Sequence, residues 1–165
     1  MKLYILSIIT VFIFSLCGFA QEIDLDKDDF RSKDDYKNAK DYLKDAEDYY
    51  ELGVGGFARA LEYYLEIHKL NPNIAALNYK IGNCYLYTFQ KEKSIDYFNK
   101  AFEINRYVAD DILFKIARGH HLNMAFDKAI EYYNKFKNLL SPKQLAQKKS
   151  KIEKYIAELK TILEN

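Results

Sequence analysis

Histidine and cysteine are the residue types most able to bind a metal ion or act as a nucleophile, and this chain has few of them. Its histidines are His68, His120 and His121, and its cysteines are Cys17 and Cys84. Neither the His-Glu-x-x-His nor the Cys-x-x-Cys pattern of metal sites is present. Neighbouring residues of a helix point about 100° apart, so His120 and His121 are poorly placed to share an ion. We therefore predict no metal, no cofactor and no catalytic residue, and we interpret His120 as a packed residue.

Two further features could carry chemistry, and each lacks what that chemistry needs. Cys84 shares a predicted helical face with Ile81 and Tyr85, which favours a core position. No neighbouring histidine or helix N-terminus is present to lower the pKa of its thiol. The run Gly53-Val54-Gly55-Gly56 could suggest a phosphate loop, but the preceding strand and the Lys-Ser/Thr pair of such loops are missing. We interpret this run as a turn between helices.

Three segments of the chain share one amphipathic helical pattern. They end at Pro72, Arg106 and Pro142. In the first segment, apolar residues fall at i, i+3, i+4, i+7 and i+10, which is one stripe of a helix. The residues of this stripe are Phe57, Ala60, Leu61, Tyr64 and Ile67. Because the third segment repeats this spacing, the pattern indicates a repeat protein.

Small residues within the stripes measure the period of this repeat. Ala60 and Ser94 are 34 residues apart, and Ser94 and Ala129 are 35 apart. A period of 34 residues is that of the tetratricopeptide repeat (TPR), a pair of antiparallel helices. The partner helices agree, because Gly82 and Ala117 are also 35 residues apart. Both occupy positions where a small residue lets two helix backbones approach closely.

The repeat predicts an all-α fold, a TPR α-solenoid of three helix-turn-helix repeats plus a C-terminal capping helix. The predicted TPR domain covers residues 32–163, with repeats at about 33–70, 72–105 and 107–140 and a capping helix at about 142–163. Asn71 is expected to cap a helix with Pro72 in its first turn. Ser141 and Gln144 are expected to form a capping box before the last helix.

The first 31 residues differ from the repeats. An apolar run over residues 3–16, followed by Gly18 and Ala20 before Gln21, predicts a secretory signal peptide at residues 1–20. An uncleaved membrane anchor is the alternative, since a span needs roughly 17 to 25 residues and eighteen here carry no charge. Residues 21–31 contain several aspartates, and we predict that they form an acidic flexible arm.

Charge and composition limit the choice of partner. Without its leader the chain has 24 basic side chains, equal to the 24 acidic ones. A neutral chain lacks the strong basic charge that nucleic acids require of their partners. We therefore predict no nucleic-acid partner and no small-molecule substrate, and membrane contact only through an uncleaved leader. Cys84 would remain as a lone cysteine, so the mature chain could form no internal disulfide.

The first helix of each repeat is expected to line the concave side of the stack. Aromatic residues and arginine dominate binding energetics at protein interfaces. Alignment on the small residues places nine groove candidates, namely Tyr79, Asn83, Leu86, Tyr87, Asp111, Phe114, Lys115, Arg118 and His121. We predict that this groove binds a peptide or a partner helix. An ordinary solvated face is the alternative for each single residue.

Three strings carry a narrower resemblance: LNPN at 70–73, NYKIGNCYL at 78–86 and HLNMAFDKAIEYY at 121–133. They resemble the N-terminal TPR region of OmpA-family envelope proteins from Bacteroidetes, of the type associated with type IX secretion and gliding. Such proteins usually continue into a β-propeller and an OmpA-like domain that binds peptidoglycan. Because the sequence stops before any such domain, the resemblance implies a periplasmic scaffold role and not wall binding.

We therefore expect an exported scaffold, periplasmic or outer-membrane associated, that mediates protein–protein interaction through its concave groove within a secretion or envelope assembly. The expected partner is a protein or peptide of the cell envelope, and the chain is not expected to be an enzyme. The alternative is a structural envelope component that binds no peptide and self-associates through its C-terminal helix.

Overall fold

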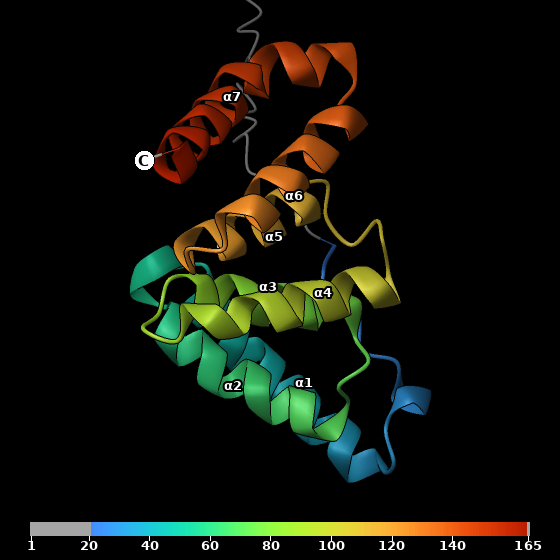
Figure 1. Ribbon diagram of the computed structural model, residues 1–165. Coiled ribbons are helices and arrows are strands. Elements are labelled where there is room, and N and C mark those ends of the chain that lie inside the picture. The colour runs from blue at the N-terminus through green and yellow to red at the C-terminus, as the bar shows by residue number, and fades with distance from the viewer. Residues whose placement is uncertain (1–20, 165) are drawn as a thin grey trace, which may run out of the picture.

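The computed structural model describes residues 21–164, and helices account for most of this part of the chain (Figure 1). The helices are α1 (Lys33–Tyr50), α2 (Phe57–Leu70), α3 (Ala75–Leu86), α4 (Ser94–Ile104), α5 (Ile112–Leu122), α6 (Phe126–Leu139) and α7 (Pro142–Glu164). Short 3-10 helices are η1 (Lys27–Asp29), η2 (Gly53–Gly55) and η3 (Lys91–Lys93). No strand occurs among the described residues, so the predicted all-α class is confirmed. The predicted signal peptide lies outside the described residues.

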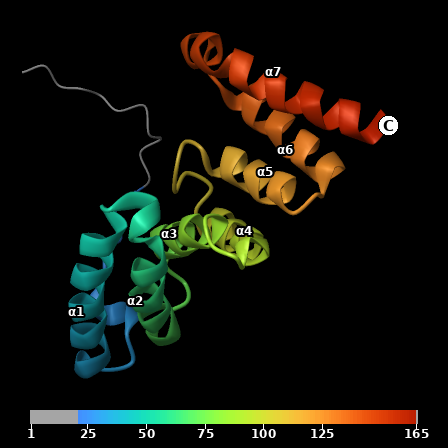
Figure 2. The same ribbon diagram turned by 90° about the vertical axis from the view of Figure 1, so that its left-hand side faces the viewer.

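The helices pack in successive antiparallel pairs. Helix α1 packs on α2, α3 on α4, and α5 on α6, and the pairs are joined by contacts of α2 with α3 and of α4 with α5. Helix α7 packs on α6 at the end of the stack. Figure 2 shows the pairs following one another from α1 and α2 to α7. The predicted solenoid of three helical pairs and a terminal helix is therefore confirmed.

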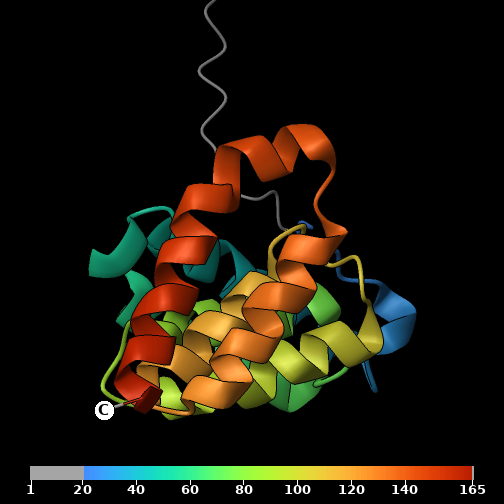
Figure 3. The same ribbon diagram turned by 45° about the horizontal axis from the view of Figure 1, so that its top comes forward.

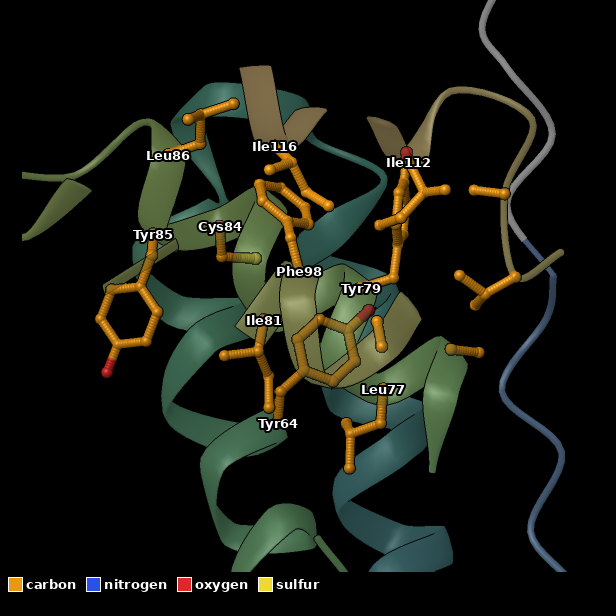
Figure 4. Packing of buried hydrophobic residues seen from close by; sticks show 14 of the residues in the cluster. Tyr64, Leu77, Tyr79, Ile81, Cys84, Tyr85, Leu86, Phe98, Ile112 and Ile116 are labelled. Carbon is orange, nitrogen blue, oxygen red and sulfur yellow. The ribbon is translucent and has the colours of Figure 1, made fainter. Parts of the chain in front are cut away.

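The small residues of the repeat lie at the closest helix contacts, as predicted. Ala60, Ser94 and Ala129 are completely buried. A Cβ atom added to Gly82 of α3 would lie 2.8 Å from the Phe98 ring of α4, too close for a real side chain. Figure 4 shows Phe98 among the buried residues of α3 and α5. Glycine at this position therefore lets α3 and α4 approach closely.

Helix α3 is the most enclosed element. Every residue from Ala76 to Leu86 is buried, because α2, α4, η3 and α5 pack against this helix. Helix α7 is the opposite case, since only Ile152, Ile156 and Leu159 of its 23 residues are buried. Figure 3 shows α7 on the outer end of the stack. A terminal helix of this kind covers the last apolar face and presents its other side to solvent.

The predicted start of α7 is confirmed in detail. The Ser141 N–H donates to Gln144 Oε1 at 3.1 Å, and the Gln144 N–H donates to Ser141 Oγ at 3.4 Å, which is a capping box. The expected Asn71 cap is wrong, because α3 begins at Ala75 and its N-cap residue is Ile74. Asn71 Oδ1 instead accepts the Asn73 N–H at 2.9 Å and forms a turn around Pro72.

The segment before α1 is not the solvated arm that its aspartates predicted. Ile23 and Phe30 are buried, and the Gln21 N–H donates to the Val108 carbonyl at 2.8 Å. Asn71 Nδ2 donates to the Asp29 carbonyl at 3.3 Å. Figure 1 shows the segment in blue along one edge of the stack. Two apolar side chains and these hydrogen bonds hold the segment in place, while its aspartates remain exposed.

Among residues 21–164, no helix combines the length and the apolar character needed to cross a membrane.

Candidate partner-binding groove

Polar side chains link the first helices of the three pairs, and we call the side of the stack that they form the inner surface. Lys80 Nζ of α3 pairs with Glu47 Oε2 of α1. Asn83 Nδ2 donates to the Tyr50 hydroxyl at 2.8 Å, and Asn83 Oδ1 accepts from Lys115 Nζ of α5 at 2.7 Å. The inner surface is therefore built from α1, α3 and α5, as the repeat pattern predicted.

Three of the nine predicted groove residues are buried within this surface. Tyr79, Asn83 and Leu86 are all less than a tenth exposed. The Tyr79 hydroxyl donates to Asp111 Oδ1 at 2.8 Å, so both residues connect α3 to the start of α5. A helical pattern shows which face these residues share but not how closely the next helix covers it. Tyr79 and Asn83 support the groove and do not provide its exposed lining.

Five of the predicted residues line one pocket, which we call the groove pocket. It has a volume of about 150 Å³ and lies between α3, α5 and α7. Its lining residues are Leu86, Tyr87, Phe114, Lys115, Arg118, Leu122, Lys151 and Tyr155. Tyr87 is the most accessible of the three aromatic residues in this lining, with 53% of its surface exposed. The structure thus brings together the aromatic and basic residues that the sequence singled out.

Helix α7 contributes two lining residues that the sequence analysis did not predict. The Tyr155 ring stacks on Tyr133 with centroids 5.6 Å apart, and Arg118 Cζ lies 5.1 Å from the Tyr155 ring centre. Lys151 Nζ lies 5.8 Å from the Phe114 ring centre. Tyr155 lies between Ile152 and Leu159 on the apolar face of α7. That spacing could have identified Tyr155 as an inward-facing residue.

His121 lies beside the groove pocket, next to Arg118 and Tyr133. Its Nδ1 atom is 3.3 Å from the Arg118 guanidinium and 3.3 Å from the Tyr133 hydroxyl. Burial and, secondarily, the charge of Arg118 lower the pKa of His121 below its usual 6.5. Burial raises the pKa of Tyr133 to about 12. Because His121 is neutral and Tyr133 is protonated at pH 7, the positive charge of the pocket comes from its lysines and arginine.

A second cavity of about 420 Å³ lies at the loop between α4 and α5. Its walls come from the end of α4, the loop that follows, the start of α5, the end of α6 and the first turn of α7. Arg106 and Asp110 both line it, so this cavity carries one cation and one anion. Tyr107 and Leu139 line this cavity, and 91% and 73% of their surfaces are exposed. None of the nine predicted groove residues belongs to this lining.

Cys84 and His120 occupy the buried positions expected of packing residues. Cys84 is completely buried, and burial raises the pKa of its thiol to about 12, so the thiol is protonated at neutral pH. His120 is 8% exposed and stacks on Tyr132 with ring centres 5.5 Å apart. Within residues 21–164, no group of three or more potential metal ligands comes together.

Comparison with known proteins supports the class of fold that this geometry indicates. Residues 75–107, which contain α3 and α4, match the tetratricopeptide repeat family. No curated protein matches the chain. The molecule is an all-α, TPR-like solenoid.

Two similar solved structures have more specific descriptions. One is the type III secretion translocator chaperone SycD of Yersinia enterocolitica. It shares 14% identity and a TM-score of 0.63, over 81% of this chain and 89% of that chain. The other is SycD in complex with a peptide of the translocator YopD, with 14% identity and a TM-score of 0.61, over 79% of this chain and 95% of that chain. At this identity the similarity is one of fold.

Proposed function

We propose that this protein is a non-enzymatic scaffold that binds a segment of another protein at the groove pocket. The supporting observation is the convergence of Tyr87, Phe114, Lys115 and Arg118 on one accessible pocket between α3, α5 and α7. Aromatic and arginine side chains of this kind are enriched where interfaces gain most of their binding energy. The complex of SycD with a YopD peptide offers a precedent for peptide binding on a similar fold.

We further propose that the protein acts in the periplasm or at the outer membrane, in a secretion or envelope assembly. The support comes from the sequence of residues 1–20 and from the resemblance to OmpA-family envelope proteins described above. Fractionation of cells that produce the chain with a C-terminal tag tests this proposal. We expect a shortened chain in the periplasmic or outer-membrane fraction, whereas an unshortened chain in the cytoplasm would contradict it.

Capture experiments with two matched double variants test the binding role. Tyr87→Ala with Arg118→Ala removes an aromatic ring and a cation from the groove pocket, whereas Tyr107→Ala with Arg106→Ala removes the same types from the second cavity. We expect the unmodified protein to capture a partner from envelope extract, the groove variant to lose it, and the second-cavity variant to retain it. Retention by the groove variant, or loss by the second-cavity variant alone, would contradict binding at the groove pocket.

Self-association through α7 is a second candidate function. Ile162 and Leu163, near the end of this helix, are 52% and 47% exposed, which leaves apolar surface uncovered. A second copy of the chain could cover these residues by packing α7 against its counterpart. Light scattering of the purified protein distinguishes the two candidates. A dimer that Ile162→Ser with Leu163→Ser dissociates would support self-association, and a strict monomer at high concentration would contradict it.

A further inference from the structure

The groove pocket contains an uncompensated positive charge. Lys115 and Arg118 of α5 and Lys151 of α7 line it, and no Asp or Glu belongs to the lining. Among the described residues, none of the ion pairs involves any of these three cations. The second cavity differs, because Arg106 and Asp110 both belong to its lining.

Each of the three cations is held in place by neutral groups. Lys115 Nζ donates to Asn83 Oδ1 at 2.7 Å, and the Arg118 guanidinium lies 5.1 Å from the ring centre of Tyr155. Lys151 Nζ lies over the Phe114 ring. Contacts with an amide oxygen or an aromatic face orient a cation but leave its net charge in place. Positive charge therefore converges on a partly enclosed space from two helices.

The negative charge of Glu158 in α7 acts to raise the pKa values of His121 and Tyr133. Its Oε1 atom, however, lies 3.8 Å from Lys154 Nζ on the same helix, and Glu158 is not part of the pocket lining. Of the residues that the structure describes, none therefore supplies a carboxylate to the lining of the groove pocket.

The size of the pocket indicates what could occupy it. Its volume of about 150 Å³ is smaller than the roughly 300 to 1,000 Å³ typical of small-molecule sites. At about 30 Å³ per water molecule, this space corresponds to a few waters, or to one side chain of a larger partner. Leu86, Leu122 and Phe114 provide apolar walls for the aliphatic part of such a side chain.

We infer that the groove pocket recognises an acidic side chain, Asp or Glu, within a partner peptide. This inference rests on the proposed function. The carboxylate lies between Lys115, Arg118 and Lys151, and a neighbouring apolar residue of the peptide packs on Tyr87.

Helix α7 is on this account part of the recognition site as well as the cover of the last repeat. Lys151 supplies one of the three charges, and Tyr155 holds Arg118 in position. Lys149 provides a matched comparison on the same helix, because it lies outside the pocket and beside Glu153, with its Nζ atom 3.8 Å from Oε1. Lys151→Gln and Lys149→Gln remove equal charge from the molecule. A difference in peptide binding between these two variants therefore reports the local role of Lys151.

Selection from a phage-displayed library of random peptides on the immobilised protein tests the inference. Peptides displayed at the N-terminus of a coat protein have no free C-terminal carboxylate, so an acidic preference must come from side chains. We expect bound peptides to be enriched in Asp or Glu next to an apolar residue. The same selection on the Lys115→Gln, Arg118→Gln, Lys151→Gln variant should show no acidic enrichment, and circular dichroism should show that this variant remains helical.

A synthetic, C-terminally amidated version of one selected peptide then gives the quantitative comparison. Replacing its acidic residue by the matching amide should weaken binding about tenfold, the effect of one charge-assisted hydrogen bond. Lys151→Gln should weaken binding of the acidic peptide, Lys149→Gln should not, and Lys151→Arg should restore most of it. Added salt should weaken binding of the acidic peptide more than that of its amide counterpart.

The failure of this inference differs from the failure of the proposed function. Selected peptides that lack acidic enrichment, yet need Tyr87 for binding, would overturn the carboxylate site and leave the scaffold function standing. Equal effects of Lys149→Gln and Lys151→Gln would also overturn it, since they would indicate only a general charge effect. A library that yields no bound peptide would overturn both.

Discussion

The cations at the two ends of the inner surface have different partners. Where α1 meets α3, Lys80 pairs with Glu47, and Glu47 also accepts the Tyr64 hydroxyl at 2.8 Å. Where α5 meets α7, Lys115 and its neighbouring cations contact neutral groups and form no ion pair within residues 21–164. The first end is internally satisfied and contributes to the stability of the fold. The second end retains a charge that a partner can neutralise, and the difference separates a structural region from a binding region.

The largest effect is expected at the satisfied end. Glu47→Leu leaves Lys80, whose side chain is only 11% exposed, without its carboxylate, and removes the acceptor of the Tyr64 hydroxyl. Breaking a buried pair costs about 3 to 5 kcal/mol, and we expect about 2 to 3 kcal/mol here because Glu47 is partly exposed. Urea denaturation measures this loss. The additional change Lys80→Met should recover part of it, and a loss below about 1 kcal/mol would show that this pair is not structural.

A smaller loss of stability is expected from the close approach of α3 and α4. Gly82→Ala adds a methyl group 2.8 Å from the Phe98 ring. Overpacking costs about 1 to 3 kcal/mol, and the better helix propensity of alanine offsets up to about 1 kcal/mol of this cost. Thermal unfolding should show a net loss, and Phe98→Leu in the same chain should reduce the penalty. If Gly82→Ala were stabilising, α3 and α4 would not be as close as described.

Replacing all three cations of the groove pocket should change stability less than Glu47→Leu or Gly82→Ala. Lys115→Gln, Arg118→Gln and Lys151→Gln together break no ion pair among the described residues and remove repulsion between like charges. We expect the free energy of unfolding to stay within about 1 kcal/mol of the original value. A loss as large as that of Glu47→Leu would mean that the two ends are equally structural.

The smallest expected effect is the contribution of His121 to the pH dependence of stability. Burial lowers the pKa of His121, so the unfolded chain binds a proton more readily than the folded chain does. His121 therefore contributes stability that is present above about pH 6.5 and is lost as pH falls through its folded pKa. Protonation would also add charge beside Arg118, while Tyr133, Tyr155 and Glu158 offer only partial compensation. Denaturation at pH 7.5 and pH 5.5 should show a smaller difference for His121→Gln than for the unmodified protein.

The fold could be predicted because its signal is repeated along the sequence. The stripe that contains Ala60 and the close-contact position of Gly82 recur at nearly constant spacing, and each recurrence supports the others. The helix ends were less certain. Ser141 and Gln144 formed the expected capping box, whereas Asn71 preferred a local turn because its short side chain reaches the backbone N–H of Asn73.

The groove was predictable in part, because periodicity identifies a face but not the depth of burial on it. Tyr79 and Asn83 share that face with Tyr87, yet only Tyr87 is well exposed. The spacing of Tyr155 marks the inward face of α7, but it does not specify how this last helix folds back over α5 and α6. The burial of Ile23 and Phe30 was missed for a similar reason, since the average composition of residues 21–31 concealed these two anchoring side chains.

The contact between Gln21 and Val108 has a consequence for how the whole molecule comes apart. Stacked repeats usually interact only with their immediate neighbours, so they can fray from either terminus one unit at a time. In this protein a segment that precedes the first helical pair reaches the loop before α5 and passes α2 on the way. Detaching the first pair therefore also disturbs the boundary of the third, and this bridge favours a single cooperative melting transition over stepwise loss of repeats.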